Sequence, residues 1–382
     1  MKQTIQFKRK TRSVFFHITT QCNLSCKHCY IDPVQHGSGM VPLENMKKWL
    51  SILKKNNTDL VFLGGEPTLH PDLSLAVKFA RKIGYQSITV DTNGYLFCNI
   101  MESVTPDDID YFSFSLDGPD QSINDSIRGN GSYAHCINGI HAARKKGFAV
   151  SLIYTVSAMN IHALHKMPSL IRQLNIQRFF IQVIGIRGKS ANNSQCNHLQ
   201  IGSDHWQKHI PPIAQQVANS GIPVVFPTVF LEPDDIFECA ARVSENFFIF
   251  PNGRVYQCPL CEDYPIHSYH ISDEGLISMP PINENQLFQL NIPEGCVMNK
   301  LVQPGNISYD RYGKPEHRIA CCLLKNHLDY TQTLCPFQSD NKDNMHFDVY
   351  SPISARASLG KKRDALFENK HVADAGKSSS AR

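Results

Sequence analysis

Three cysteines near the start of the chain have a spacing that suits metal chemistry. Cys22, Cys26 and Cys29 stand in the segment QCNLSCKHCY, directly after the apolar run SVFFHIT over 13–19. In a reducing compartment, thiols at such short spacing bind metals or clusters more often than they form disulfides. A structural zinc site needs four ligands, and His28, which could be proposed as the fourth, is adjacent to Cys29 and poorly placed to share one metal with it. Three thiolates on a four-iron cluster instead leave one iron open for a further ligand.

A second group of cysteines lies in the last 150 residues of the chain. Its members are Cys239, Cys258, Cys261, Cys296, Cys321, Cys322 and Cys335. Near them, the segment FFIFPNGRVYQC predicts a β-hairpin, because Asn and Gly tolerate the positive φ of a tight turn. The segment has too few aliphatic residues for a core of its own, so we expect metal clusters to stabilise a small domain here. Three isolated cysteines, Cys98, Cys136 and Cys196, are interpreted as small buried hydrophobic residues.

The elements that position these cysteines are predicted by apolar runs that alternate with amphipathic stretches. Short apolar runs with little alternation are typical of strands buried on both faces of a parallel sheet. The predicted strands cover 13–19, 59–65, 87–93, 111–117, 149–156 and 178–186. The predicted helices cover 43–56, 71–83, 132–146, 160–174 and 203–219. Gly84, Gly147, Gly221 and Asn175 follow helical stretches, where a residue with a left-handed conformation commonly ends the helix.

This order predicts an α/β fold with a partial (β/α)6 barrel of parallel strands and a small cysteine-rich C-terminal domain that binds a cluster. The functional loops of such a barrel lie at the carboxyl ends of its strands. We predict four segments. They are an N-terminal extension over 1–12, the barrel over 13–230, the cysteine-rich domain over 231–338, and a disordered tail over 339–382, with a terminal helix as the alternative for the tail.

The spacing of Cys22, Cys26 and Cys29 after the first strand resembles the signature of the radical S-adenosylmethionine (SAM) superfamily, which is cysteine, three residues, cysteine, two residues, cysteine. The resemblance implies a [4Fe-4S] cluster on these three cysteines, with SAM bound at the open iron. It also implies that the chain is an enzyme that reductively cleaves SAM to a 5′-deoxyadenosyl radical, which abstracts hydrogen from a substrate. The cofactor supplies this chemistry, and the protein orients it and excludes water.

Polar residues at four other strand ends agree with the resemblance. It implies that the GGEP segment binds the methionine amino group, with the glycines allowing close approach of the backbone and Glu66 accepting from the ammonium. It also implies contacts to the ribose and the methionine carboxylate near SLDGP, with Arg128 as a carboxylate partner. The predicted cofactor-binding residues are Gly64, Gly65, Glu66, Pro67, Asn93, Ser115, Asp117 and Arg128.

Several other residues near the strand ends are interpreted from their types and positions. Gly185, Arg187 and Gly188 suit packing near the adenine. His17, Tyr30, Tyr95 and Tyr154 are interpreted as packing residues, and the sequence assigns no catalytic acid, base or radical quencher.

The second cysteine group resembles the SPASM and twitch domains of radical SAM enzymes, which carry auxiliary [4Fe-4S] clusters. The closely spaced run of four later cysteines that marks SPASM domains is absent, so we expect one auxiliary cluster, with two as the alternative. Cys239 and Cys258 are the predicted ligands, and the others come from Cys261, Cys296 and either Cys321 or Cys322. A zinc ribbon is the alternative in which no cluster is bound here.

Composition and charge narrow the function further. A formal net charge of +4 over 382 residues gives no reason to expect nucleic acid as a partner, and no apolar run is long enough to span a membrane. We expect a cytoplasmic protein with a peptide or small-molecule substrate and an electron donor such as flavodoxin or ferredoxin.

The main hypothesis is a peptide-modifying maturase, although no peptide-recognition domain is expected before the first strand. The alternatives are a small-molecule oxidoreductase or cofactor-biosynthesis enzyme, and a non-enzymatic iron–sulfur sensor or zinc-binding protein.

Overall fold

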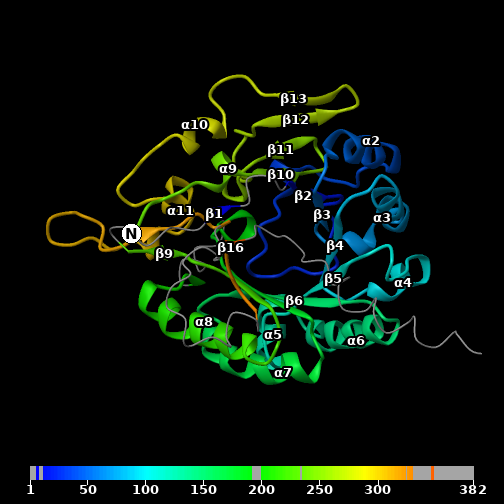
Figure 1. Ribbon diagram of the computed structural model, residues 1–382, viewed down its shortest axis with the longest axis horizontal. Helices are drawn as coiled ribbons and strands as arrows, with labels where there is room; N and C mark the ends of the chain where they lie inside the picture. The colour runs from blue at the N-terminus through cyan, green and yellow to red at the C-terminus, as the bar shows by residue number, and fades with distance from the viewer. Residues whose placement is uncertain are drawn as a thin grey trace, which may run out of the picture. The chain divides into compact units, whose positions relative to one another are not determined.

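The computed structural model describes residues 6–7, 12–191, 199–232, 235–323, 325–329 and 346–347. Its main feature is a curved twelve-stranded sheet, shown in Figure 1. Across the sheet the strands follow the order β13-β12-β11-β10-β2-β3-β4-β5-β6-β7-β8-β15. In chain order they are β2 (Arg12–His17), β3 (Thr58–Leu63), β4 (Ser87–Thr92), β5 (Tyr111–Ser115), β6 (Val150–Val156), β7 (Arg178–Val183), β8 (Val224–Pro227), β10 (Glu245–Ile249), β11 (Arg254–Tyr256), β12 (Tyr269–Ser272), β13 (Gly275–Ser278) and β15 (Lys325–Leu328).

The predicted fold class is confirmed. Each of the six predicted strands is present as β2 to β7, and every neighbouring pair among them is parallel. The parallel array also extends by one strand on each side, because β10 pairs with β2 and β8 pairs with β7 in the same direction. Since the carboxyl ends of parallel strands meet at one edge, the loops after β2 to β7 surround a common mouth.

Helices cover the outer side of the curved sheet (Figure 1). The α-helices are α1 (Pro33–His36), α2 (Leu43–Leu53), α3 (Leu73–Lys82), α4 (Ile100–Ser103), α5 (Gln121–Arg128), α6 (Ser132–Lys145), α7 (Met167–Gln173), α8 (Ser203–Ala218), α9 (Ala240–Val243), α10 (Glu284–Phe288) and α11 (Val297–Val302). Short 3-10 helices are η1 (Pro67–Leu69), η2 (Phe97–Asn99), η3 (Ile161–Lys166), η4 (Gly188–Ser190), η6 (Pro259–Cys261) and η7 (Pro304–Asn306). The predicted helix over 160–174 is divided into η3 and α7, and α5 was not predicted.

The turns that follow the helices have the backbone conformation expected from the sequence. Gly84, Gly147 and Gly221 have φ values of 84°, 86° and 82°, and Asn175 has φ 51°. Such values are costly for most side chains but available to glycine and tolerated by asparagine. These four residues therefore follow the ends of α3, α6, α8 and α7 and direct the chain into the next strand.

The predicted hairpin is present as β10 and β11, which pair antiparallel. It does not stand apart from the barrel, because β10 also pairs in parallel with β2 over five residues. Arg12 fixes this joint, with Nε and Nη2 donating to the two Glu245 carboxylate oxygens at 2.9 and 3.0 Å. The sheet thus runs continuously across the predicted boundary at residues 230 and 231, and the described residues cluster as one compact unit. The boundary itself stays a prediction.

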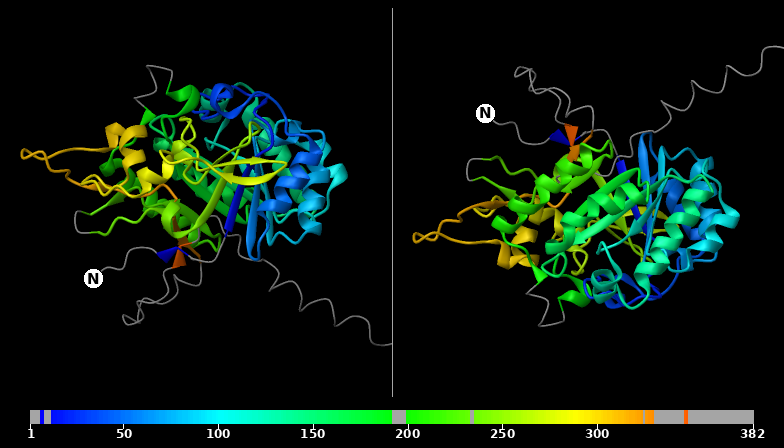
Figure 2. Two further views of the ribbon diagram at one scale, coloured as in Figure 1. Left: turned by 90° about the horizontal axis from the view of Figure 1, so that it is seen from above. Right: turned by 90° about the horizontal axis from the view of Figure 1, so that it is seen from below.

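The segment over residues 239–329, which carries the second cysteine group, is called the cysteine module here. In Figure 2 its orange loops project from one side of the barrel, and in the left view its yellow strands extend over the middle of the molecule. Two further strand pairs lie outside the main sheet: β9 (Phe230–Leu231) with β14 (Arg318–Ile319), and β1 (Gln6–Phe7) with β16 (His346–Phe347). Apart from β16, the predicted tail over 339–382 lies outside the described residues, as do Cys196, Cys335 and the side chain of Cys98.

Two hydrophobic cores stabilise this arrangement. The larger packs the helices against the sheet and includes Trp49, Phe62, Phe112 and Trp206. The second joins the barrel interior to the cysteine module and includes Phe15 and Phe248, whose rings stack at 4.5 Å. Within the described ranges, none of the helices has the length and hydropathy needed to cross a bilayer.

Candidate functional site

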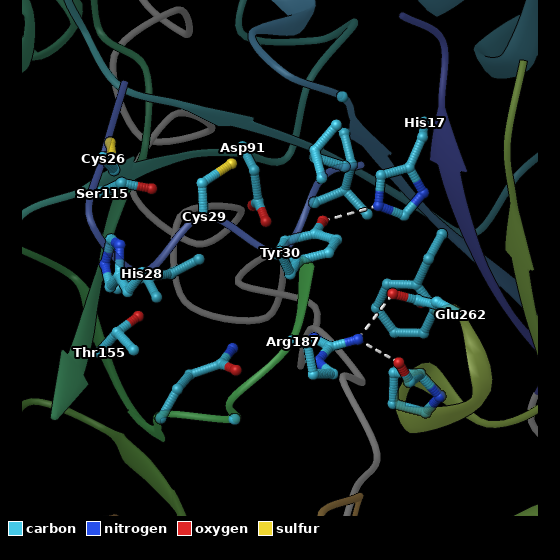
Figure 3. Close-up of a pocket in the computed structure, with 18 of the residues that line it drawn as sticks. His17, Cys26, His28, Cys29, Tyr30, Asp91, Ser115, Thr155, Arg187 and Glu262 are labelled. Carbon is cyan, nitrogen blue, oxygen red and sulfur yellow. Dashed lines mark hydrogen bonds and ion pairs between the residues drawn. The ribbon is translucent and has the colours of Figure 1, made fainter. Parts of the chain in front are cut away.

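A cavity of about 310 Å³ opens at the carboxyl ends of the parallel strands. The three cysteines of the first group lie on its wall, as do residues from the ends of β3 to β7. The cysteine module closes another side with Pro259, Leu260, Glu262, Cys322, Leu323 and Lys325. The barrel and the module therefore contribute to one space, part of which is shown in Figure 3.

The first cysteine loop is held against the loops of neighbouring strands. Cys22 is exposed, and Cys26 and Cys29 are partly exposed. The Lys27 amide donates to the Ile127 carbonyl at 3.0 Å, which fixes the loop to α5. Burial raises the pKa of the Cys26 thiol to about 11, against the opposing effect of the Arg128 guanidinium. Since a thiolate is the ligand form, a bound cation is needed to stabilise ionised Cys26 at neutral pH.

Gly64 and Gly65 line the cavity as predicted. Their lack of a side chain makes room for another part of the protein's own backbone. A Cβ on Gly65 would lie 2.3 Å from the Gln21 carbonyl oxygen, and one on Gly64 would lie 2.6 Å from that of Thr19. The Gly65 amide donates to Thr19 and the Glu66 amide donates to Gln21, both at 2.8 Å. The glycines thus let the loop after β3 pair with the chain that leads into Cys22.

Glu66 lines the cavity, but its carboxylate is largely engaged within the protein. It is 1% exposed, and Oε1 accepts from the Thr68 amide, the Thr68 hydroxyl and the Thr92 hydroxyl. Oε2 accepts from the Asn93 amide at 2.7 Å. These bonds tie the end of β3 to the end of β4. Pro67 lies on the cavity wall beside Glu66, and its ring occupies the first position of η1.

Asn93 and Ser115 both line the cavity, as predicted. The Asn93 side-chain amide donates to Asn23 Oδ1 at 2.9 Å and lies 3.9 Å from the Cys22 sulfur. Asn93 therefore reaches from the end of β4 to the cysteine loop.

Asp117 lies behind the cavity wall, and this differs from its predicted role as a direct cofactor contact. It is fully buried, because β5 ends at Ser115 and the chain turns inward. Its Oδ2 lies 2.6 Å from Arg128 Nε and 2.7 Å from His28 Nε2. Arg128 does line the cavity, so Asp117 orients Arg128 rather than touching a ligand.

His28 is bonded to Asp117, which agrees with the sequence-based argument against His28 as a metal ligand shared with Cys29.

A buried polar cluster on the module side of the cavity was not predicted as a unit. Arg187 Nη1 lies 2.8 Å from Glu262 Oε2, and its guanidinium stacks 4.8 Å above the Tyr30 ring. The Tyr30 hydroxyl bonds to His17 Nε2 at 2.7 Å (Figure 3). Burial raises the pKa of Glu262 to about 8, although Arg187 opposes the rise. His17 and Tyr30 were interpreted as packing residues, and no local motif marks Glu262.

Asp91 is a further carboxyl group on the cavity wall, at the end of β4. It lies near Cys29 and Tyr30 in Figure 3. Burial raises its pKa to about 7, and Glu66 nearby adds to the rise. A cationic group in the cavity would therefore favour ionised Asp91.

The cysteines of the second group converge on a second, smaller cavity. Its wall includes Cys239, Cys258, Cys296, Cys321 and Cys322. Cys261 is buried beside Cys258, and its amide donates to the Cys258 carbonyl at 3.1 Å. All six cysteines of the module within the described residues therefore surround one place. The structure brings together the predicted ligands Cys239, Cys258, Cys261, Cys296 and Cys321, and Cys322 joins them.

Glu284 supports the Cys258 loop and was missed by the sequence analysis. Its carboxylate is buried and accepts from the amides of Gln257, Cys258 and Ser268 and from the Ser268 hydroxyl. Burial raises the pKa of Glu284 to about 7. A single glutamate thus links α10 to the turn that presents Cys258.

Both cysteine groups fit iron–sulfur clusters by donor type and spacing. Within the described ranges, no three His, Cys, Asp or Glu side chains are close enough together to hold one metal ion. A zinc site needs its donors within about 2.3 Å of one centre, whereas a four-iron cluster spreads its thiolates over a larger body. The large cavity beside Cys22, Cys26 and Cys29 offers space for a small ligand next to such a cluster.

A family model for the radical SAM superfamily matches residues 16–169. This range of the chain therefore contains a radical SAM domain. Members of this superfamily use a [4Fe-4S] cluster and SAM, and the matched range contains Cys22, Cys26 and Cys29 together with every predicted cofactor-binding residue.

Two curated relatives differ in how much of this chain they match. Fe-coproporphyrin III synthase from Methanosarcina barkeri is 28% identical over 196 residues, which cover 50% of this chain and 49% of that protein. The antilisterial bacteriocin subtilosin biosynthesis protein AlbA from Bacillus subtilis is 24% identical over 296 residues, which cover 75% of this chain and 64% of that protein. The chain thus spans about half to two thirds of the length of these relatives.

Among solved structures, Streptococcus suis SuiB bound to its precursor peptide SuiA superposes with a TM-score of 0.60. The sequence identity is 13%, over 76% of this chain and 70% of SuiB, so the likeness concerns the fold. The superposition covers more of this chain than the family model does, so the shared α/β fold extends beyond residues 16–169.

Proposed function

We propose that this protein is a radical SAM maturase that modifies a peptide substrate. The observation that carries the proposal is the shared cavity of about 310 Å³, which the cluster-binding loop and the cysteine module line from different sides. The more extensive match to AlbA supports a peptide substrate, because it covers 75% of this chain against 50% for the coproporphyrin synthase.

Cys22, Cys26 and Cys29 would hold the cluster, and the ends of β3 to β5 would hold SAM. When bound, this pair supplies the reductive cleavage of SAM and the abstraction of hydrogen from the substrate. Arg128 would bind a carboxylate at the cavity wall, and the buried carboxylate of Asp117 keeps its guanidinium in place. Asn93 orients the Cys22 end of the loop through Asn23.

The remaining wall of the cavity excludes water and receives the substrate. Apolar side chains such as Leu260, Leu323 and Ile184 face it from the module and from the end of β7. Exclusion of water protects a reactive intermediate from side reactions.

We infer one auxiliary [4Fe-4S] cluster in the cysteine module. Its support is the convergence of five cysteines on a single small cavity, with Cys261 buried beside Cys258, whereas two clusters need two separate ligand sets. Cys322 lies on the walls of both cavities, so this cluster would stand next to the substrate.

Two further properties belong to this proposal. An electron donor such as flavodoxin or ferredoxin would reduce the cluster on Cys22, Cys26 and Cys29. Cysteines at the short spacings of cluster ligands fit the reducing cytoplasm, where such donors work.

The test is anaerobic reconstitution, an iron count and an assay of dithionite-driven 5′-deoxyadenosine release. We expect about eight irons per chain for two four-iron clusters. Joint replacement of Cys22, Cys26 and Cys29 by alanine should abolish release and leave about four irons. Cys136→Ala, a buried cysteine outside both groups, is the matched control and should retain both properties. Release that survives the triple replacement would refute the proposed site, and about twelve irons would require a second auxiliary cluster.

A small-molecule or cofactor-biosynthesis enzyme is the second candidate, favoured by the match to the coproporphyrin synthase. Release of 5′-deoxyadenosine that is stimulated by a tetrapyrrole and by no peptide would establish it instead.

A further inference from the structure

The short segment from Cys321 to Lys325 separates the two cavities. Cys321 lines the small cysteine cavity, Cys322 lines both, and Lys325 lines only the large one. Within five residues the chain therefore passes from the auxiliary cysteine site to the space proposed for the substrate.

The sheet topology places Lys325 at the mouth of the barrel. Lys325 is the first residue of β15, which runs antiparallel to β8 and pairs Lys325 with Pro227, the last residue of β8. The predicted cofactor residues stand at the ends of β2 to β5, whereas β8 lies beyond β6 and β7 in the sheet. Lys325 thus belongs to the part of the cavity away from the proposed SAM site.

The ammonium group of Lys325 has no carboxylate partner among the residues that the structure describes, and the ionisable groups that act on it electrostatically are the thiols of Cys322 and Cys321. Lys325 is 6% exposed and lines the cavity, and no hydrogen bond or ion pair joins its ammonium group to another side chain within the described ranges. The two arginines on the same wall differ, because Arg128 is paired with Asp117 and Arg187 is paired with Glu262. A buried charge without a partner is costly, so a site of this kind is completed by an anion.

We propose that Lys325 binds a carboxylate of the substrate and so selects substrates that carry an anionic group on the side away from SAM. This inference rests on the proposed radical SAM function and adds a substrate class to it. The ammonium would form a charge-assisted hydrogen bond that is shielded from water by Leu323 and neighbouring apolar residues. The cost of burying the cation would then be offset only when the correct substrate is bound, which gives discrimination against neutral analogues.

A competing role for Lys325 is to balance the charge of the auxiliary cysteines, since Cys321 and Cys322 are close enough to interact with it electrostatically. Its position favours the substrate role, because Lys325 lines the large cavity and is absent from the lining of the cysteine cavity. The two roles make different predictions for a variant that lacks the charge.

The test uses the reconstituted protein with SAM bound and a pair of probes that differ only in charge, N-acetyl-leucine and N-acetyl-leucine amide. Binding is measured by ligand-observed NMR in the wild type, Lys325→Gln and Lys325→Arg. Lys300→Gln is the matched control, because Lys300 is also in the module but pairs with Glu294 at the surface. The reduction potential of the auxiliary cluster and the release of 5′-deoxyadenosine are measured on the same samples.

We expect the wild type to bind the free acid about tenfold more tightly than the amide, as one charge-assisted hydrogen bond implies. Lys325→Arg and Lys300→Gln should keep this preference, and Lys325→Gln should lose it. Equal binding of the two probes to the wild type, or an unchanged preference in Lys325→Gln, would overturn the proposal. So would a shifted auxiliary potential with an unchanged preference, which would assign Lys325 to the cluster. Absence of release from the wild type would instead refute the radical SAM function.

Discussion

At the scale of single residues, the structure separates side chains that face the cavity from those that position them. Asp117 is the clearest case, since it is buried behind the wall and bonded to both Arg128 and His28. A buried carboxylate with two basic partners is stable only as a group. Asp117 therefore fixes the position of Arg128 on the cavity wall, although Asp117 does not line the cavity itself.

Replacement of Asp117 by asparagine should destabilise the protein more than loss of a surface ion pair. The substitution leaves Arg128 buried without its counter-charge, and such losses cost about 3–5 kcal/mol of unfolding free energy. Asp273→Asn is the control, because its pair with Lys48 is about half exposed on both sides and is worth about 1 kcal/mol or less. Urea unfolding of the metal-free protein measures both. Equal losses in the two variants would contradict the role given to Asp117.

The same residue predicts a pH dependence of stability. Burial alone would raise the pKa of Asp117, but Arg128 and His28 lower it from 3.8 to about 2. Below pH 3.8 the unfolded chain takes up a proton that the folded protein still excludes. The stabilising contribution is therefore complete above pH 3.8 and is lost as the pH falls towards 2. The difference in unfolding free energy between the wild type and Asp117→Asn should shrink over this interval. A difference that stays constant would show that the carboxylate is not responsible.

Residue types and spacing predicted which cysteines act together. The sequence did not predict which way the side chains of the other site residues point. Cys22, Cys26 and Cys29 stand in one short loop, so their convergence follows from local spacing. Asp117 was expected to face the ligand because it lies two residues after Ser115, and that alternation holds only within a strand. The strand ends at Ser115, and the turn that follows directs Asp117 into the interior. The roles of the predicted cofactor residues stay predictions.

At the scale of elements, the loop after β3 and the chain after β2 form one unit. Gly65 is bonded to Thr19 through its amide, and its Cα lies against the Gln21 carbonyl. The loop that carries Cys22 begins one residue later. The GGEP segment therefore fixes the start of the cluster-binding loop as well as lining the cavity.

Gly65→Ala should disrupt this unit. The added methyl group would lie 2.3 Å from the Gln21 carbonyl oxygen, which forces the two backbones apart. We expect a loss of about 1–3 kcal/mol of unfolding free energy, as is usual for overpacked sites, and a lower iron content after reconstitution. Gly202→Ala is the control, because no atom lies within 4 Å of its added Cβ. Full iron content in Gly65→Ala would show that the loop holds its position without the glycine.

The sequence predicted the repeating βα elements because each has a local signal, such as an apolar run or Gly84 after a helix. The pairing of β10 with β2 had no such signal. The two strands are more than 200 residues apart, and the local turn PNG predicted only the antiparallel partner, β11. Lys325 was missed for a similar reason, because β15 has four residues and its place beside β8 depends on long-range pairing.

At the scale of the whole molecule, the joint between β2 and β10 makes the barrel and the cysteine module one structural body. Phe15 from β2 stacks on Phe248 from β10 with ring centroids 4.5 Å apart, and both belong to the core shared with the module. Continuous strand pairing and a shared core favour cooperative unfolding. The relative position of the two cysteine groups should then be preserved until the whole body unfolds.

The metal-free protein should therefore unfold in one denaturant transition, seen alike by two probes. Fluorescence reports the barrel, because both tryptophans, Trp49 and Trp206, lie in its core. Thiol labelling reports the module through Cys258 and Cys261, which are buried. Phe248→Ala should lower both midpoints together, because the ring belongs to the shared core. The expected loss of unfolding free energy is about 3–5 kcal/mol. Leu301→Ala, at a side chain that is 57% exposed in the module, should change stability by about 0.5 kcal/mol or less. If the thiols react at lower denaturant than the fluorescence change, the module unfolds separately, and the cavity between the two cysteine groups owes its shape to the bound clusters rather than to the sheet.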